Sequence, residues 1–140
     1  MRISCLAVVG AAAWLTSSSP ALAHHSFAAE FDASRPIKLT GVVKRMEFSN
    51  PHSWLYIDVQ TNAGETQEWA VEGAAPNALM RRGWNRSSLP AGTVVNVQGF
   101  QARDRSFRAA GRNVTLPDGS SLFVGSTGIG APGEENEPVE

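Results

Sequence analysis

A β-hairpin is predicted by residues 54–72, which read WLYIDVQTNAGETQEWAVE. Leu55, Ile57 and Val59 alternate with more polar residues, and this period of two is typical of a strand with one buried face. Residues 61–64, Thr-Asn-Ala-Gly, supply a turn before a second alternating stretch begins at Gln67. We therefore expect two paired strands at the centre of the domain.

Strand and helix patterns flank this hairpin on both sides. The strand before it changes phase at residues 41–43, which indicates a β-bulge. After it, a short helix is expected to begin at Pro76 and to be capped by Gly83. In chain order, the expected elements are a strand at 37–48, the hairpin strands at 54–59 and 67–72, a helix at 76–82, strands at 93–102 and 107–116, and a short edge at 122–124.

This order predicts a mainly β fold, a small five-stranded OB-like barrel with one short helix between strands 3 and 4. Periodicity leaves one alternative, an open β-sandwich with one helix, because closure of a barrel is not visible in a pattern. The barrel domain is expected at residues 37–124, after an N-terminal arm at 24–36 in which Phe27 and Phe31 attach the arm to the body. Residues 125–140 are rich in Gly, Pro and Glu and predict a disordered acidic tail.

Composition excludes several classes of protein. The 140 residues include 12 Lys and Arg against 13 Asp and Glu, so the formal net charge is −1 and general nucleic-acid binding is not expected. With 42% hydrophobic and 18% charged residues, the chain has enough apolar material for one core. We therefore expect a single folded domain.

Residues 1–23 have the pattern of a secretory signal peptide. Arg2 is followed by an apolar run, and Ala21-Leu22-Ala23 is a small-x-small cleavage site. The run is shorter than the roughly 20 residues that span a bilayer, so no stable membrane anchor is expected after cleavage. The sequence predicts a periplasmic protein that begins at His24 and lacks cysteine, since Cys5 leaves with the signal peptide.

Three histidines carry the chemistry that the sequence suggests. If cleavage follows Ala23, His24 offers its α-amine and its imidazole as one chelate, His25 follows directly, and His52 lies in a turn. Nitrogen ligation of this kind suits Cu(II), which leads the divalent affinity order. A copper ion bound by His24, His25 and His52 is therefore one hypothesis, although polar or structural roles for these histidines are an alternative and the sequence leaves contact between the terminus and His52 open.

Other polar patterns are less specific. The strand carboxylates are expected to be solvated, and no serine has the context of a hydrolase nucleophile. Arginines at the end of the predicted helix and just after it form, with Trp84, a candidate anion-binding patch, yet a helix C-terminus attracts cations through its dipole alone. The residues concerned are Asp32, Glu47, Asp58, Glu68 and Glu72 for the carboxylates, and Arg81, Arg82 and Arg86 for the patch.

Several motifs resemble one family of small exported bacterial proteins of unknown function. They are the His-His-Ser-Phe start at 24–27, the Asn-Pro-His-x-Trp turn at 50–54, Pro-Asn-Ala-Leu-Met at 76–80 and Thr-Leu-Pro-Asp-Gly at 115–119. The resemblance implies export and a small β-rich domain. It implies no activity and no catalytic residue.

The sequence thus favours a periplasmic metal-binding protein that is not an enzyme. The alternative from another class is an envelope interaction or ligand-binding module that binds a small ligand through the face around Trp54, Tyr56, Trp69 and Arg81. A third hypothesis is a copper-dependent oxidative enzyme, which would need an open coordination position on the metal and a surface that binds substrate. A protein partner is not identified by the sequence.

Overall fold

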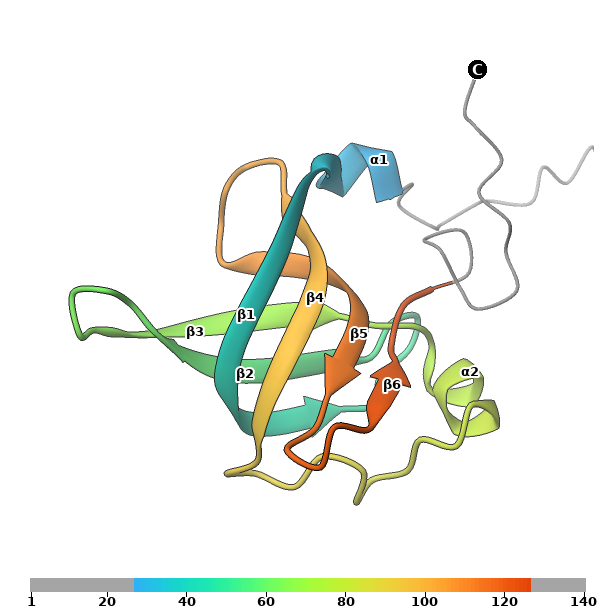
Figure 1. Ribbon diagram of the computed structural model, residues 1–140. Helices are drawn as coiled ribbons and strands as arrows, with labels where there is room; N and C mark the ends of the chain where they lie inside the picture. Colours follow the sequence, from blue (N-terminus) through green and yellow to red (C-terminus); the bar gives the residue numbers. More distant parts are fainter. Residues whose placement is uncertain (1–26, 127–140) are drawn as a thin grey trace, which may run out of the picture.

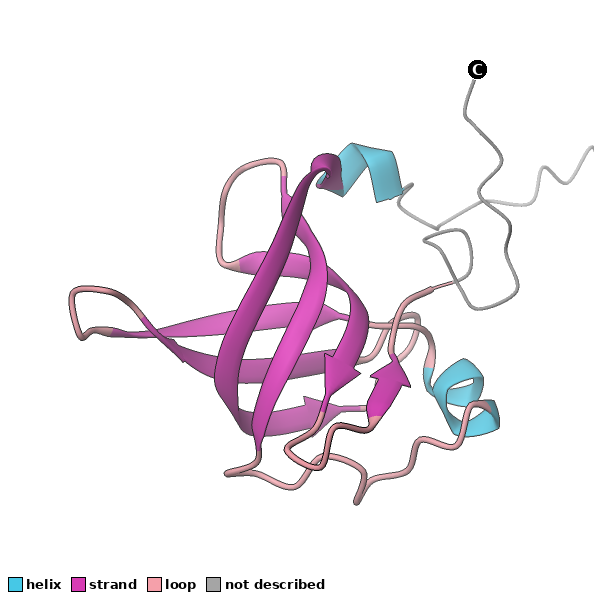
Figure 2. Cartoon of the chain, in the orientation of Figure 1, coloured by secondary structure: helices cyan, strands magenta, loops and turns pink. Residues whose placement is uncertain are grey.

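The computed structural model describes residues 27–126, which form a mainly β domain (Figures 1 and 2). Its elements, in chain order, are α1 (Phe27–Glu30), β1 (Phe31–Glu47), β2 (Trp54–Gln60), β3 (Thr66–Glu72), α2 (Pro76–Arg81), β4 (Val94–Ala102), β5 (Arg108–Thr115) and β6 (Ser121–Phe123). Among these residues no helix has the length and apolar character to span a bilayer.

The strands form one sheet in the order β3-β2-β1-β4-β5-β6, and β3 also pairs with β5. Neighbours in this order are antiparallel, whereas the β3–β5 pairing is parallel. The pairings therefore lead from β3 through β2, β1, β4 and β5 back to β3. The long curved strands β1 and β4 run side by side from the top toward the bottom of the view in Figure 1.

Three details differ from the sequence prediction. Six strands are present where five were expected, because the short edge near residue 122 pairs with β5 as a strand of its own. Two short helices are present where one was expected, since α1 precedes the first strand. That strand begins at Phe31 instead of Ile37, because β1 pairs with β4 from Phe31 onward across an irregular step.

The central hairpin has the register that the alternation predicts. Leu55 lies opposite Val71 and Ile57 lies opposite Trp69, and all four side chains are buried. The turn is closed by the Thr61 N–H, which donates to the Glu65 carbonyl at 2.8 Å. The apolar face of this hairpin therefore supplies the middle of the core.

The first strand carries the irregularity that its phase change predicts. The register of β1 against β2 shifts between Val43 and Arg45. At Gly41, a Cβ would meet the Asp58 carbonyl oxygen at 2.9 Å, so a side chain there would crowd the neighbouring strand. This position favours glycine because the two backbones approach closely.

Helix α2 ends in the cap that the sequence predicts. Gly83 has a φ of 90°, and its N–H donates to the Met80 carbonyl, while the Trp84 N–H donates to the Leu79 carbonyl, both at 3.1 Å. This pair of bonds is a Schellman motif. It turns Trp84 inward, where its indole is buried and donates from Nε1 to the Phe123 carbonyl at 3.1 Å.

A second, smaller apolar cluster lies where α1 meets the sheet. Phe31 is buried with Ala102 and Ala110, and Phe27 packs against them. The Phe27 ring lies 5.8 Å from the Phe31 ring and 5.6 Å from the Phe100 ring. The prediction that Phe27 and Phe31 attach this segment to the body is confirmed.

Packing continues just past the predicted C-terminal end of the domain. Gly125 is buried, and its carbonyl accepts a hydrogen bond of 2.6 Å from Nη1 of Arg82. The prediction that the disordered tail begins at Gly125 is therefore wrong for this residue. The rest of the predicted acidic tail, from residue 127, lies outside the described residues, as do the predicted signal peptide and residues 24–26 of the arm.

Candidate functional site

His52 lies in the turn between β1 and β2, beside the end of β3. The Ser49 hydroxyl donates to the His52 carbonyl at 3.0 Å, and the preceding Asn50–Pro51 peptide bond is cis. The next residue, Ser53, joins the backbone ladder, since its N–H donates to the Ala74 carbonyl at 3.1 Å and its carbonyl accepts from the Gly73 N–H at 2.8 Å. These bonds fix the turn against the residues that follow β3.

The imidazole of His52 contacts the carboxylate of Glu72. The contact joins Nδ1 of His52 to Oε1 of Glu72, and the exposed fractions of the two side chains are only 19% and 14%. A carboxylate on Nδ1 favours the tautomer with the proton on that nitrogen, which leaves the lone pair on Nε2. Metal-binding histidines in proteins have this arrangement, in which the carboxylate orients the ring and raises its basicity.

The sequence did not predict this contact. The prediction that Glu72 is solvated is wrong, because its side chain is only 14% exposed and contacts a histidine 20 residues earlier in the chain. Glu72 is the last residue of β3 and lies opposite Trp54, the first residue of β2. The only available signal was positional, because a hairpin brings the residue before its first strand close to the end of its second strand.

Arg108, at the start of β5, connects this region to α1. Its Nη2 lies 3.0 Å from Oε2 of Glu30, and its guanidinium carbon lies 5.7 Å from the Trp54 ring and 6.0 Å from the Phe31 ring. The parallel register places Ala110 beside Glu72 and Arg108 beside Ala70, so Arg108 and Glu72 lie two positions apart on paired strands. A continuous set of contacts therefore runs from α1 to the neighbourhood of His52.

Arg103 also binds this helix. Its backbone N–H donates to the Glu30 carbonyl at 2.9 Å, and its Nε donates to the Ala28 carbonyl at 2.6 Å. Two of the carbonyls that α1 leaves without intrahelical partners are thus satisfied by the turn between β4 and β5. The chain is anchored at α1 by residues more than 70 positions away.

Of the three predicted metal ligands, only His52 can be placed. His24 and His25 lie outside the described residues, and Phe27 is the first described residue, three positions after His24. Within residues 27–126 no group of three or more His, Cys, Asp or Glu side chains forms a candidate metal cluster.

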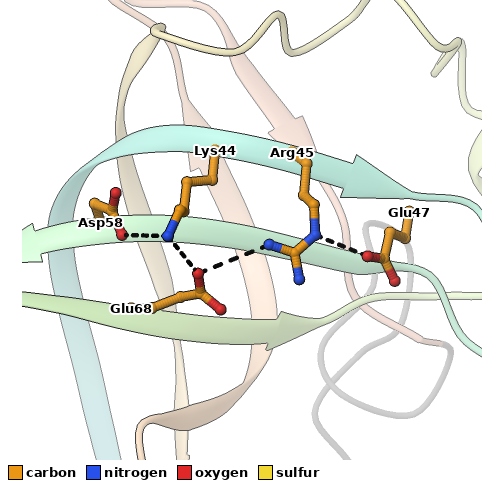
Figure 3. Close-up of polar contacts among 5 residues, drawn as sticks. All are labelled: Lys44, Arg45, Glu47, Asp58 and Glu68. Atoms are coloured by element: carbon orange, nitrogen blue, oxygen red, sulfur yellow. Dashed lines mark hydrogen bonds and ion pairs between the residues drawn. The ribbon is translucent and has the colours of Figure 1, made fainter.

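The remaining strand carboxylates form an exposed charge network on β1, β2 and β3 (Figure 3). Nζ of Lys44 lies 2.7 Å from Glu68 and 3.5 Å from Asp58, while Nε of Arg45 lies 2.8 Å from Glu47. The hydrogen bond from Lys44 lowers the pKa of Glu68, and the same bond raises the pKa of Lys44. Because the side chains are 30–46% exposed, these pairs are solvated contacts of small energy and not an acid–base site.

Asp32 also has a local structural role. Its Oδ1 accepts hydrogen bonds from the Ser34 N–H at 3.0 Å and the Ser34 hydroxyl at 2.6 Å. The side-chain bond is the larger cause of the lowered pKa of Asp32. This is an Asx-type turn and needs no ligand.

The predicted aromatic face is not a single surface. Trp54 and Tyr56 are half-buried on the outer side of β2, and the Arg45 guanidinium lies 3.6 Å from the Tyr56 ring centre. Trp69, by contrast, belongs to the core and is 8% exposed. Trp69 is therefore not part of this face, because its side chain points inward while those of its neighbours in β3 point outward. Arg81, the fourth residue of that prediction, lies at the end of α2.

The predicted arginine patch is also divided by the fold. Trp84 is buried, Arg82 is bound to the Gly125 carbonyl and lies 4.9 Å from the Phe123 ring, and Arg86 lies 5.8 Å from the Phe48 ring. Arg82 therefore holds the C-terminal end of the domain. Arg82 and Arg86 thus each have a partner within the fold, whereas Arg81 lies at the end of α2.

A family of unknown function (DUF6152) matches residues 13–111 of this chain. This match is consistent with the resemblance to an uncharacterised family; export and the role of the motifs stay predictions. No functionally curated protein matches the chain. No solved structure matches it either.

Proposed function

Since the chain belongs to the DUF6152 family, whose function is unknown, we propose its function from its own residues: it binds copper through its mature N-terminus and His52. In this proposal residues 1–23 are removed as a signal peptide and the protein acts in the periplasm. It binds the ion without catalysing a reaction. The closed cycle of strand pairings from β3 back to β3 is, in the same proposal, an OB-type barrel that carries the site on its outer side.

The contact between His52 and Glu72 is the observation that carries this proposal. A shielded carboxylate on Nδ1 fixes the ring and favours the lone pair on Nε2, which is the requirement for an imidazole ligand. A histidine that only caps a turn has no need of such a partner. His52 is therefore the described residue best suited to hold a metal.

The chemistry of the predicted terminus supports copper as the ion. Cleavage after Ala23 would join the α-amine and the imidazole of His24 in one chelate, and His25 adds another imidazole. Ligands made only of nitrogen favour Cu(II) over other divalent first-row ions. The α-amine titrates near 7.7–8.0 in model peptides, so binding at neutral pH releases its proton and weakens in acid.

Export is tested separately from metal binding. Intact-mass measurement of the protein from a periplasmic extract is expected to give a chain that begins at His24. Recovery of the full-length chain in the membrane fraction would reject both the cleavage and the chelate.

Copper binding is tested by a Cu(II) titration of the mature protein and of a matched protein with one extra residue before His24. The extension removes the amine–imidazole chelate and leaves every side chain in place. We expect a much weaker affinity for the extended protein, with the same thermal midpoint, and a second loss in His52→Ala. If the two proteins bind Cu(II) equally, the metal hypothesis is wrong, and a ligand-binding module that uses the outer side of β2 at Trp54 and Tyr56 takes its place.

A further inference from the structure

We propose that the segment between β3 and β4, residues 73–93, forms with its neighbours a surface that binds an anionic lipid membrane peripherally. The surface consists of two exposed arginines and three exposed apolar side chains, namely Arg81, Arg86, Met80, Val94 and Val42. This inference goes beyond the proposed function and is independent of metal binding.

The segment is rich in arginine and lacks carboxylates. Residues 73–103 contain four arginines and no Asp or Glu. Arg82 binds the Gly125 carbonyl and Arg103 binds α1, but no carboxylate of the described residues pairs with Arg81 or Arg86, and both of these residues are exposed. The positive charge of these two arginines complements an anionic surface.

The carboxylates on the neighbouring strands have cations of their own. Asp58 lies opposite Val42 in the register of β1 and β2, and its Oδ1 is 3.5 Å from Nζ of Lys44. Oε1 of Glu47 is 2.8 Å from Nε of Arg45. Neither carboxylate therefore requires an arginine of the segment as its partner.

Exposed apolar side chains accompany the arginines. Of the four large apolar residues that are exposed within the described part of the chain, three lie in this segment or beside it. Met80 is 50% exposed in α2, Val94 is 50% exposed where the segment enters β4, and Val42, opposite Val94 on β1, is 42% exposed. In Figure 1 the chain between α2 and β4 runs along the lower edge of the domain. Single exposed apolar residues are ordinary, but apolar residues beside cations are typical of surfaces that bind at the boundary between lipid headgroups and acyl chains.

Buried residues hold the segment on the core. Leu79, Trp84 and Leu89 are buried and are separated by the exposed residues of the segment. The backbone N–H of Trp84 donates to the Leu79 carbonyl, and its indole Nε1 donates to the Phe123 carbonyl, both at 3.1 Å. The surface is therefore formed before a partner arrives, and binding does not require the segment to become ordered.

A lipid membrane fits both kinds of side chain on this surface. Guanidinium groups bind phosphate oxygens with two hydrogen bonds, and phospholipid headgroups supply such oxygens. The acyl boundary just below the headgroups accepts apolar side chains that are otherwise in water. A soluble phosphate would bind Arg81 and Arg86 but would leave Met80 and Val94 exposed, so the combination favours a lipid surface.

Flotation with lipid vesicles tests the proposal. The chain from His24 to Glu140 is used, because the apolar run of the predicted signal peptide would itself bind lipid. Vesicles of phosphatidylcholine with phosphatidylglycerol are compared with vesicles of phosphatidylcholine alone. We expect binding to the anionic vesicles that weakens as salt is added, and no binding to the neutral vesicles. Equal binding to both kinds, or no binding to the anionic vesicles at low salt, would overturn the proposal.

Single substitutions locate the surface. An arginine near an anionic leaflet contributes about 1 kcal/mol, so Arg81→Gln and Arg86→Gln are each expected to weaken vesicle binding about fivefold. Arg105→Gln is the matched control, because Arg105 is also exposed but follows the far end of β4, whose length separates it from Val94 by about 27 Å. Arg105 also lies near Phe107, which is 44% exposed, so the turn between β4 and β5 is the competing surface. A loss in Arg105→Gln as large as that in Arg81→Gln would refute the assignment to the segment.

Met80→Gln distinguishes a lipid from a soluble polyanion. Glutamine has a similar length and a similar helix propensity, but it does not favour the acyl boundary. We expect a severalfold loss of affinity for the anionic vesicles, with unchanged binding to heparin and an unchanged thermal midpoint. If Met80→Gln keeps full affinity for vesicles, or if the parent protein binds heparin but not vesicles, a lipid is not the partner of this surface.

Discussion

Replacing Glu72 with glutamine tests the carboxylate that orients His52. Glutamine has the same shape and keeps an oxygen that accepts a hydrogen bond from Nδ1, but it lacks the negative charge that raises the basicity of the ring. Removing a carboxylate partner of a metal-binding histidine typically weakens metal affinity about 10–100-fold. Because glutamine keeps the acceptor, we expect the lower end, about tenfold, which corresponds to about 1.4 kcal/mol.

The assay is a competition titration with Cu(II) near neutral pH on the mature protein and on Glu72→Gln. Glu47→Gln is the matched control, since Glu47 also ends a strand, but its side chain is 46% exposed and pairs with Arg45. The thermal midpoint of each protein shows whether the substitution has changed the fold. We expect a loss of affinity only in Glu72→Gln.

The coupling between Glu72 and His52 gives a stricter criterion. In a His52→Ala background the ring that Glu72 orients is gone, so Glu72→Gln is expected to have no further effect on affinity. Full Cu(II) affinity in Glu72→Gln, or an equal loss with and without His52, would refute the role assigned to this pair.

Three further predictions concern stability and charge. Ile57→Ala is expected to cost about 2–5 kcal/mol in denaturant unfolding, because Ile57 is fully buried in the core; a near-neutral result would contradict its packing. Lys44→Met is expected to raise the lowered pKa of Glu68 toward its ordinary value in an NMR titration, since the Lys44 hydrogen bond is the main cause of the shift. The stabilising effect of that bond is present above the ordinary pKa of Glu68 and is lost as the pH falls through the lowered pKa. An unchanged pKa in the variant would argue against the contact. Deleting residues 127–140 is expected to leave the thermal midpoint within a degree or so, because these residues offer little apolar area to bury, and a fall of several degrees would show that they dock on the domain.

Local patterns were sufficient for the elements whose contacts are close in sequence. The hairpin of β2 and β3 was predictable because its alternation fixes which side chains face inward and its turn residues fix the register. The cap of α2 was predictable because only a few residues, of which glycine is the commonest, adopt the positive φ found at Gly83. The burial of Leu55 and Ile57 was predictable from the same alternation in the hairpin.

Contacts between distant segments were not predictable in the same way. The early start of β1 at Phe31 depends on pairing with β4, and the packing of Gly125 depends on Arg82, which is 43 positions earlier. The prediction that Trp69 lies on an outer face was wrong for a local reason, since the alternation of β3 puts Trp69 on the same side as Val71, and both side chains are buried. Periodicity carries no information on contacts between segments so far apart in the sequence.

The candidate site shows the same division. The chemistry of an imidazole and the proximity of His52 to a turn are properties of the sequence, and so is the chelating potential of a terminal histidine. Tertiary structure determines the partner of His52, since Glu72 contacts it only when the β1–β2 turn packs against the end of β3. The arginines that bind α1 likewise come from distant segments, namely β5 and the turn before it. The sequence determines the chemistry that each side chain can perform. Which charged group lies within a few ångströms of that side chain depends on strand pairing between segments that are distant in the sequence.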